Sequence, residues 1–362
     1  MMTHGQYIQL LRRMIRIPSP TFGEEAVHCL LRSELDALGI EHKPYGHNII
    51  ALNRTYSPDR KTLALCAHID TVEACSGYTR DPFDPGEEED IVYGLGANDD
   101  GASVVSMLAA FRHFYEAELP FNLMLILSCE EERSGSGGVA MLYGPEGPFG
   151  SARLPRPDWM IIGEPTGMKA ATSERGLLVL DAEAQGVSGH AARQEGVNAL
   201  YIALEDIAGL RDFRFDRVSP VMGEVRLNVT QIQAGSAHNV IPDLCRFVVD
   251  IRPNELYTNE ELLAMLQAQC RSSLRARNLR NRSSVTAEDS PLLATARKMG
   301  IECFSSPTTS DWIRIQCDGI KMGPGDSSRS HKADEYILVS EIHEAIERYI
   351  EFIDNFYGNT LE

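Results

Sequence analysis

The 362-residue sequence has no apolar run as long as the roughly 18 residues that a membrane-spanning helix needs. Its longest apolar runs, such as LMLILSC at 123–129, have the length of a strand. The N-terminal segment mixes basic and polar residues with apolar ones and has no small-residue cleavage site, which is typical of a first amphipathic helix. The sequence therefore predicts no membrane partner, and we expect a cytoplasmic protein.

Paired cysteines and positive charge are also scarce. The eight cysteines form no CxxC pair, and Cys66 and Cys129 lie in apolar runs, which is typical of buried thiols in a reducing compartment. Zinc held by cysteine is therefore not expected. Only 34 Lys and Arg stand against 52 Asp and Glu, and a net charge of −18 would repel the phosphates of a nucleic acid.

The first 170 residues alternate between helical and strand patterns. Helices are expected at 3–16, at 24–38 and after Gly101, the second of them behind a capping box formed by Thr21 and Glu24. Short apolar runs separate them: NIIAL, TLALCAHID, NLMLILSC and WMIIG. This alternation predicts an α/β sheet with helices on both faces and with polar residues gathered beyond the carboxyl ends of the strands.

The pattern changes after about residue 175. Six segments between 176 and 288 are predicted as strand, helix, strand, strand, helix and strand, which is the ferredoxin-like order. A helix, a short strand and a closing amphipathic helix follow. We therefore expect one domain formed by 1–174 and 287–362, interrupted by a smaller ferredoxin-like α+β domain at 175–286. The Arg-rich run 271–282 is interpreted as a solvated helix face, with anion or subunit contact as the alternative.

Two early motifs place ionisable residues where strands or turns end. His68 and Asp70 in CAHIDTV are two residues apart, so in an extended strand they point to the same face. Asp99 and Asp100 lie in the Gly-rich turn GLGANDDGAS, just before a helix. Taken alone, the histidine could be structural, and the turn could be a helix cap with a solvated neighbour.

Three later motifs add more carboxylates and a second histidine. Five apolar residues run into Glu130, Glu131 and Glu132, which would need a cation if buried but could also form a solvated loop. Glu164 ends the strand WMIIGE, and His331 lies in a polar loop after a short strand. Together the five motifs supply the ligands of a carboxylate-rich dinuclear zinc site, with one carboxylate left free to act as a base.

In their order, the strings AHID, GLGANDD, EEERS, GEPT and GPG…SHKADEY resemble the zinc-dependent aminoacylase and deacylase family of co-catalytic metallopeptidases. The family includes acetylornithine deacetylase, succinyl-diaminopimelate desuccinylase, aminoacylases and glutamate carboxypeptidases. The resemblance extends over nearly the whole chain, and GEPT with the late His motif is closest to the acetylornithine deacetylase branch.

The resemblance implies a role for each motif residue. Asp99 would bridge two Zn²⁺ ions, for which Co²⁺ or Mn²⁺ could substitute. His68 and Glu164 would complete one ion, and Glu132 and His331 the other. Asp70 would orient His68, and Glu131 would be the general base. These ligands, base and orienting residue are His68, Asp70, Asp99, Glu131, Glu132, Glu164 and His331.

The sequence departs from the family pattern in three places. The family's Asp-Glu-Glu is Glu130-Glu131-Glu132 here, so the base and ligand could instead be the pair one residue earlier. We prefer the later pair because it keeps the following Arg-Ser in step with the deacetylase pattern. Ala67 replaces a glycine, which should be tolerable, and Asp100 stands where many members have methionine, for which we have no functional account.

The resemblance also assigns the inserted domain and the reaction. His190 would donate to the developing oxyanion across a homodimer formed by this domain, Asn239 would contact substrate, and Arg252 would bind its α-carboxylate. A simple turn at His190 and a surface ion pair at Arg252 are the alternatives. The implied activity is hydrolysis of an N-acyl amino acid, and the substrate expected first is N-acetylornithine, an intermediate of arginine biosynthesis. Alternative substrates are N-succinylornithine, N-acetylcitrulline and the diaminopimelate or lysine derivatives. Alternative functions are peptidase activity or a metal-free binding protein.

Overall fold

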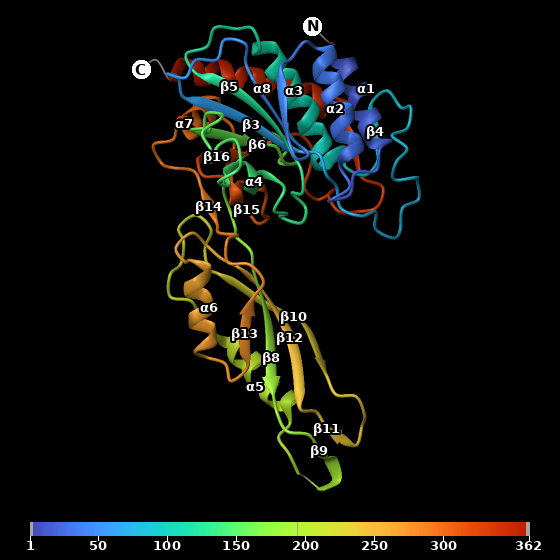
Figure 1. Ribbon diagram of the computed structural model, residues 1–362, viewed down its shortest axis with the longest axis vertical. Coiled ribbons are helices and arrows are strands. Elements are labelled where there is room, and N and C mark those ends of the chain that lie inside the picture. The colour runs from blue at the N-terminus through green and yellow to red at the C-terminus, as the bar shows by residue number, and fades with distance from the viewer. Residues whose placement is uncertain (1–2, 194, 360–362) are drawn as a thin grey trace. The chain divides into compact units, whose positions relative to one another are not determined.

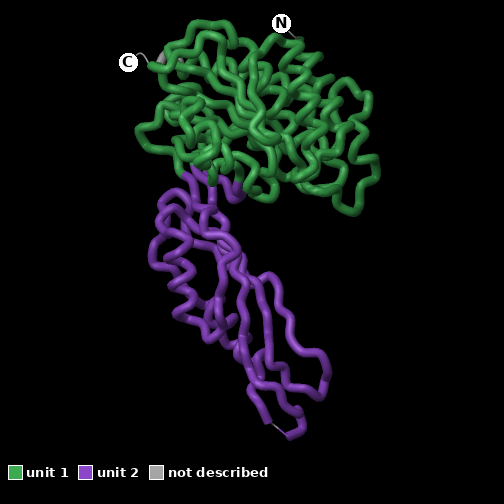
Figure 2. Tube along the Cα trace, in the orientation of Figure 1, with its two compact units in different colours: residues 1–172, 285–304, 310–362 green, residues 173–284, 305–309 purple. Residues whose placement is uncertain are grey.

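The computed structural model describes residues 3–193 and 195–359, which form two compact units (Figure 2). Unit 1 comprises 1–172, 285–304 and 310–362, and unit 2 comprises 173–284 and 305–309. The helices of unit 1 are α1 (His4–Ile15), α2 (Glu25–Ala37), α3 (Ala102–Phe114), α4 (Val139–Tyr143), α7 (Pro291–Lys298) and α8 (Val339–Asn359). Among the described residues, no helix combines the length and apolar character that a membrane crossing requires.

A mixed sheet of nine strands forms the centre of unit 1 (Figure 1). Its strands are β1 (His42–Tyr45), β2 (Asn48–Leu52), β3 (Thr62–His68), β5 (Asn122–Ser128), β6 (Trp159–Ile162), β7 (Ala170–Glu174), β14 (Ser284–Val285), β15 (Cys303–Ser306) and β16 (Asp318–Lys321). They lie in the order β1-β2-β5-β3-β6-β16-β7-β14, and β15 also pairs with β7. The central strands β5, β3, β6 and β16 are parallel, so their carboxyl ends meet at one edge.

The two faces of this sheet are covered unequally. Along β3, Leu63 and Leu65 face a core built with α1, α2, α3, α7 and α8, whereas Ala64 and Cys66 face a smaller core with α4 and Trp312. This alternation follows from the two-residue period of a strand. Elements cover both faces, which confirms the predicted fold class, but most of the helical mass lies on one face (Figure 1).

The predicted capping box at the start of α2 is wrong. Glu24 occupies the cap position without a side-chain hydrogen bond to the first turn of the helix. The Thr21 hydroxyl instead donates to the Asp70 carboxylate at 2.8 Å, and the Glu24 carboxylate accepts from the backbone N–H of Glu130 at 3.1 Å. The Glu24 carboxylate also accepts from the N–H of Phe22 at 3.0 Å, so neither side chain caps the first turn of the helix.

Unit 2 has the predicted ferredoxin-like chain order. Its strands are β8 (Leu178–Gln185), β10 (Arg226–Ala234), β12 (Leu244–Arg252) and β13 (Ser273–Ala276), and its helices are α5 (Ala199–Asp212) and α6 (Asn259–Gln267). The antiparallel sheet has the order β10-β12-β8-β13. Alternate residues of β8 and β12 are buried in a core with both helices.

The fourth strand of this sheet is not where the sequence pattern placed it. The segment 283–288 contributes β14 to the large sheet, and β13 comes from the Arg-rich run 271–282, for which a helix face was expected. Leu274 and Ala276 pack toward the core of unit 2, whereas the flanking arginines point to solvent. Arg277, just after β13, forms an ion pair at 2.7 Å with Asp181 of the neighbouring strand β8. Part of the positive charge of the Arg-rich run is therefore neutralised.

Candidate metal centre

His68 lies at the carboxyl end of β3, buried at the edge where the parallel strands end. Its Nδ1 is 2.9 Å from the backbone carbonyl oxygen of Asp70 and 3.6 Å from the Asp70 carboxylate. Its Nε2 is 3.2 Å from Oδ1 of Asp99. The Nδ1 contact orients the imidazole and leaves Nε2 directed at Asp99, as expected for a metal-binding histidine held by an outer partner.

Asp99 lies in the short helical turn η1 (Ala97–Gly101), which is held by hydrogen bonds to the segment 326–335 near the C-terminus. Strand β17 (Tyr336–Leu338) pairs with β4 (Ile91–Tyr93), and the buried Glu335 carboxylate accepts from the backbone N–H groups of Asn98 and Asp99 at 2.8 and 3.0 Å. The Asn98 side chain also bonds the backbone of Asp326. These contacts carry His331 to within 3.8 Å of the Asp99 carboxylate.

The three consecutive glutamates after β5 point in different directions. The backbone N–H groups of Glu131 and Glu132 donate to the two Asp70 carboxylate oxygens at 3.0 and 3.2 Å. The Glu132 carboxylate lies 3.0 Å from Nε2 of His331. The Glu130 carboxylate turns back and accepts from the N–H of Gly137 at 2.7 Å, away from the histidines.

Glu164 follows β6 and completes the cluster. Ligand atoms of His68, Asp99 and Glu132 lie within 4.8 Å of one another, and so do those of His68, Glu131 and Glu164. Because the two triplets share His68, the structure brings all five residues together, with His331 bonded to Glu132.

The charges of this cluster are unbalanced. Burial alone would lower the pKa of His68, but hydrogen bonds to Asp70 and Asp99 raise it well above its usual range. Burial raises the pKa of Glu131 and of Glu164 well above theirs. Buried carboxylates are costly unless paired with cations, and a histidine and carboxylate donor set suits Zn²⁺, Co²⁺ or Mn²⁺. The residues present therefore fit a divalent metal centre.

A hydrogen bond to Glu132 raises the pKa of His331 to about 9. Two further buried acids, Glu335 and Asp311, were not singled out in the sequence analysis. Burial raises the pKa of Glu335 to about 8. Asp311, in the short helix η3 (Asp311–Arg314), accepts from the Ser128 hydroxyl at 2.7 Å, and burial raises its pKa to about 6. No local pattern distinguishes Asp311 or Glu335 from an exposed acid, so only their burial identifies them.

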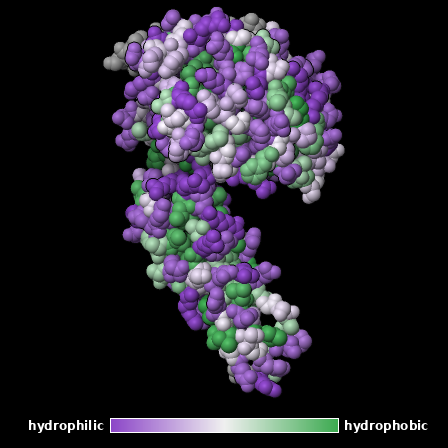
Figure 3. All heavy atoms as spheres, viewed as in Figure 1, coloured by the Kyte–Doolittle hydropathy of each residue, from purple (hydrophilic) through white to green (hydrophobic). Residues whose placement is uncertain are grey.

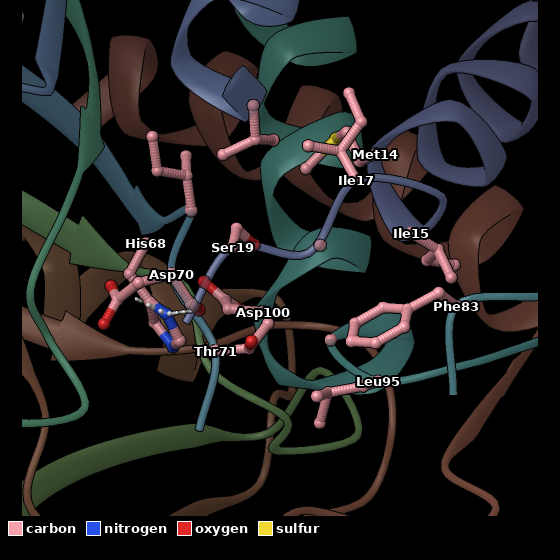
Figure 4. Close-up of a pocket in the computed structure, with 14 residues that line it drawn as sticks. Met14, Ile15, Ile17, Ser19, His68, Asp70, Thr71, Phe83, Leu95 and Asp100 are labelled. Atoms are coloured by element: carbon pink, nitrogen blue, oxygen red, sulfur yellow. Dashed lines mark hydrogen bonds and ion pairs between the residues drawn. The ribbon is translucent and has the colours of Figure 1, made fainter. Parts of the chain in front are cut away.

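A small cavity of about 20 Å³ lies behind His68 (Figure 4). His68, Asp70, Thr71 and Asp100 gather at one end of it, and apolar side chains such as Phe83 line the other. This volume has room for about one water molecule. Neither Asp100 carboxylate oxygen has a hydrogen-bond partner among the described residues, and burial raises the pKa of Asp100 to about 8.

The remaining predicted residues belong to unit 2. His190 is on β9 (Gly189–His190), which pairs with β11 (Val240–Ile241), and the N–H of Ala191 donates to the Asn239 carbonyl oxygen at 3.0 Å. His190 and Asn239 therefore lie close together. Arg252 is at the far end of β12 and forms an ion pair with Asp250 at 2.8 Å, which matches the surface pair considered above.

Comparison with known proteins gives a family match over most of the chain. The family model described as Peptidase family M20/M25/M40 matches residues 64–355. The acetylornithine deacetylase of Proteus mirabilis (strain HI4320) is 29% identical, over 97% of this chain and 96% of that protein.

Solved structures share the fold at low identity. The M20 family metallo-carboxypeptidase Sso-CP2 of Sulfolobus solfataricus superimposes with a TM-score of 0.78 at 17% identity, covering 97% of this chain and 99% of that one. The YXEP protein of Bacillus subtilis, a dinuclear metal binding peptidase, gives a TM-score of 0.72 at 16% identity, with 97% of each chain covered.

Proposed function

Because this chain belongs to peptidase family M20/M25/M40, we propose that it is a metal-dependent amidohydrolase that removes the acyl group from an N-acyl amino acid. N-acetylornithine is the first substrate to test, because the family resemblance implies a reaction of arginine biosynthesis. The observation that carries the proposal is that His68, Asp99, Glu132 and Glu164 gather beyond the strand ends, with Glu131 beside them, and that the partly exposed His331 contacts Glu132 and lies near Asp99. The similarity to an acetylornithine deacetylase supports this substrate class.

In the proposed assignment, Asp99 together with His68, Glu164, Glu132 and His331 would hold two divalent ions, zinc or cobalt. When bound, divalent ions act as Lewis acids that polarise a carbonyl oxygen and lower the pKa of water. A dinuclear centre is described for the Bacillus subtilis YXEP protein, which shares the fold.

Residues of this chain would transfer the proton of the attacking water and keep the ligands in position. Glu131 would accept a proton from the attacking water and return it to the leaving nitrogen. The water oxygen joins the acyl carbon as the C–N bond breaks, so a carboxylate and a free amine leave. Asp70 is a positioning residue because it binds the backbone of Glu131 and Glu132 and contacts His68.

Unit 2 would complete the site in a homodimer. We propose that His190 of one protomer donates to the developing oxyanion in its partner, and that Asn239 and Arg252 contact substrate. The proximity of His190 and Asn239 supports a joint role. Hydrophobic residues at the surface of unit 2 support a protein contact (Figure 3), and Leu204, Ile232 and Val240 are among those exposed.

A substrate panel tests this function. Metal-replete protein would be given N-acetyl and N-succinyl derivatives of ornithine, citrulline, lysine and diaminopimelate, alongside unblocked dipeptides, and amine release would be measured. We expect strong turnover of one N-acyl amino acid. Preference for the dipeptides would replace the proposal with peptidase activity. Metal analysis should find about two ions per chain, and a content near zero would indicate a binding protein instead.

A further inference from the structure

Lys321 is a buried lysine that the proposed mechanism does not use. It is the last residue of β16, in the middle of the large sheet, and only 2% of it is exposed. Burying an ammonium group costs several kcal/mol unless a negative charge compensates for it. A lysine is therefore an expensive choice in a strand whose neighbours Ile320 and Met322 are apolar and fully buried.

The sheet register places Lys321 beside the segment that carries Glu164. Lys321 pairs with Ile162 of the parallel strand β6, and the N–H of Gly163 donates to the Cys66 carbonyl oxygen at 2.7 Å, which continues the ladder past the strand end. Side chains two residues apart on an extended chain share a face. Lys321, Ile162 and Glu164 therefore project from the same face of the sheet.

The chain beyond β16 fixes this arrangement. The N–H of Met322 donates to the Ile162 carbonyl oxygen at 2.8 Å, and the N–H of Thr166 donates to the Gly323 carbonyl oxygen at 3.2 Å. A Cβ atom at Gly323 would lie 2.6 Å from the Glu164 carbonyl oxygen, so only glycine permits this approach of the two backbones. The end of β16 and Glu164 are thus held together from both sides of the lysine.

The electrostatics agree with this placement. Burial raises the pKa of Glu164, and the positive charge of Lys321 is the largest influence that opposes the rise, ahead of that of His68. Asp99 and Asp100 act in the opposite direction. Lys321 is thus close enough to Glu164 for its charge to act on that carboxylate.

We propose that Lys321 is a positioning residue for the metal centre, whose ammonium group holds the buried Glu164 carboxylate in the place from which it binds a divalent ion. This inference rests on the proposed function, because it takes Glu164 as a ligand. Outer partners of this kind commonly change metal affinity by about 10- to 100-fold when they are removed.

Equilibrium metal binding tests the proposal without any substrate. Metal-free K321M, K321R and wild-type protein would compete with a chromophoric chelator for Co²⁺ and Zn²⁺. We expect K321M to bind one of two ions about 10- to 100-fold more weakly. K321R retains the positive charge and should restore most of this loss. The control M322L changes the next buried residue, without altering charge, and should bind both ions as the wild type does.

Repeating the K321M substitution in an E164Q variant distinguishes an effect that acts through Glu164 from a general loss of packing. With E164Q as the reference, adding K321M should cause no further loss of metal affinity. This double variant also remains usable if K321M alone fails to fold, because it buries neither charge. An equal loss in both backgrounds, or wild-type affinity in K321M, overturns the inference. If the wild-type protein itself binds no divalent ion, the proposed function fails instead, and with it the premise of the inference.

Discussion

At the scale of single residues, three adjacent glutamates with the same side chain are given different environments by one turn. Glu130 has a left-handed backbone, with φ of 58°, and its carboxylate folds onto Gly137. Glu131 and Glu132 instead face the histidines, with their N–H groups fixed by Asp70. We therefore keep the later pair as the proposed base and ligand.

We predict that Glu131→Gln retains bound metal but lowers kcat by at least about 10²-fold, because the amide cannot accept the proton of the attacking water. Metal content and kcat would be measured on the same preparation. The matched control is Glu130→Gln, which should keep most of the activity because its carboxylate serves only the turn. Loss of activity in the control but not in Glu131→Gln would move the assignment one residue earlier.

Asp100 differs from its neighbour Asp99 because, among the described residues, its carboxylate oxygens have no hydrogen-bond partner. Burial raises its pKa from 3.8 to about 8, so between these values the folded state holds a proton that the unfolded state releases. Stability must then fall as pH rises through this window.

Asp100→Asn has a similar shape and does not titrate. We expect the metal-free variant to gain stability relative to the metal-free wild type as pH rises from 4 to 8, reaching at least about 1 kcal/mol. Urea unfolding at several pH values would measure the difference. A difference that does not change with pH would show that Asp100 is not protonated in the folded protein.

At the scale of elements, the position of Glu164 depends on close packing between β6 and α3. A Cβ atom at Gly163 would lie 2.7 Å from Cβ of Ser103 in the first turn of α3 and 3.2 Å from Cβ of Ala67 in β3. Glycine at this position lets the strand end approach both elements.

Gly163→Ala should therefore destabilise the protein by about 1–3 kcal/mol, the usual cost of overpacking, and weaken metal binding by displacing Glu164. The comparison is Gly209→Ala in the last turn of α5, where no atom outside the local helix backbone lies within 4 Å of the added methyl group. That change should stabilise the protein by up to about 1 kcal/mol. Equilibrium unfolding of both variants measures the contrast, and similar values for the two would contradict the packing argument.

At the scale of the whole molecule, the candidate metal ligands belong to unit 1, as do both tryptophans of the sequence, Trp159 and Trp312. Tryptophan fluorescence therefore reports the unfolding of unit 1, whereas far-ultraviolet circular dichroism reports both units.

We predict that metal stabilises unit 1 selectively. Free Zn²⁺ or Co²⁺ at 100 times its Kd should add about 2.7 kcal/mol to the state that binds it. Chelation should lower the urea midpoint seen by fluorescence, and the dichroism transition should contain a part that does not move. A fluorescence midpoint that ignores both metal and chelator would contradict a metal centre in unit 1.

Local sequence patterns were sufficient for most elements of both units. Residues 48–52 form β2, as the run NIIAL predicts, and the helices α1, α3 and α8 lie where apolar spacing places them. His68 ends β3, and acidic residues follow the ends of β5 and β6, because an apolar run stops where the edge of the sheet meets solvent or a site. The motif residues of the candidate centre could therefore be found in the sequence.

Tertiary structure alone decided how those residues meet and what their neighbours do. The pairing of β4 with β17 and the hydrogen bonds of Glu335 bring His331 to Asp99, although the two are distant in sequence. Part of the Arg-rich run pairs with β8 as β13, and Lys321 lies beside the segment that carries Glu164 because β16 pairs with β6. Residue periodicity records only which side of an element is buried, whereas long-range hydrogen bonds between backbones determine which elements face each other.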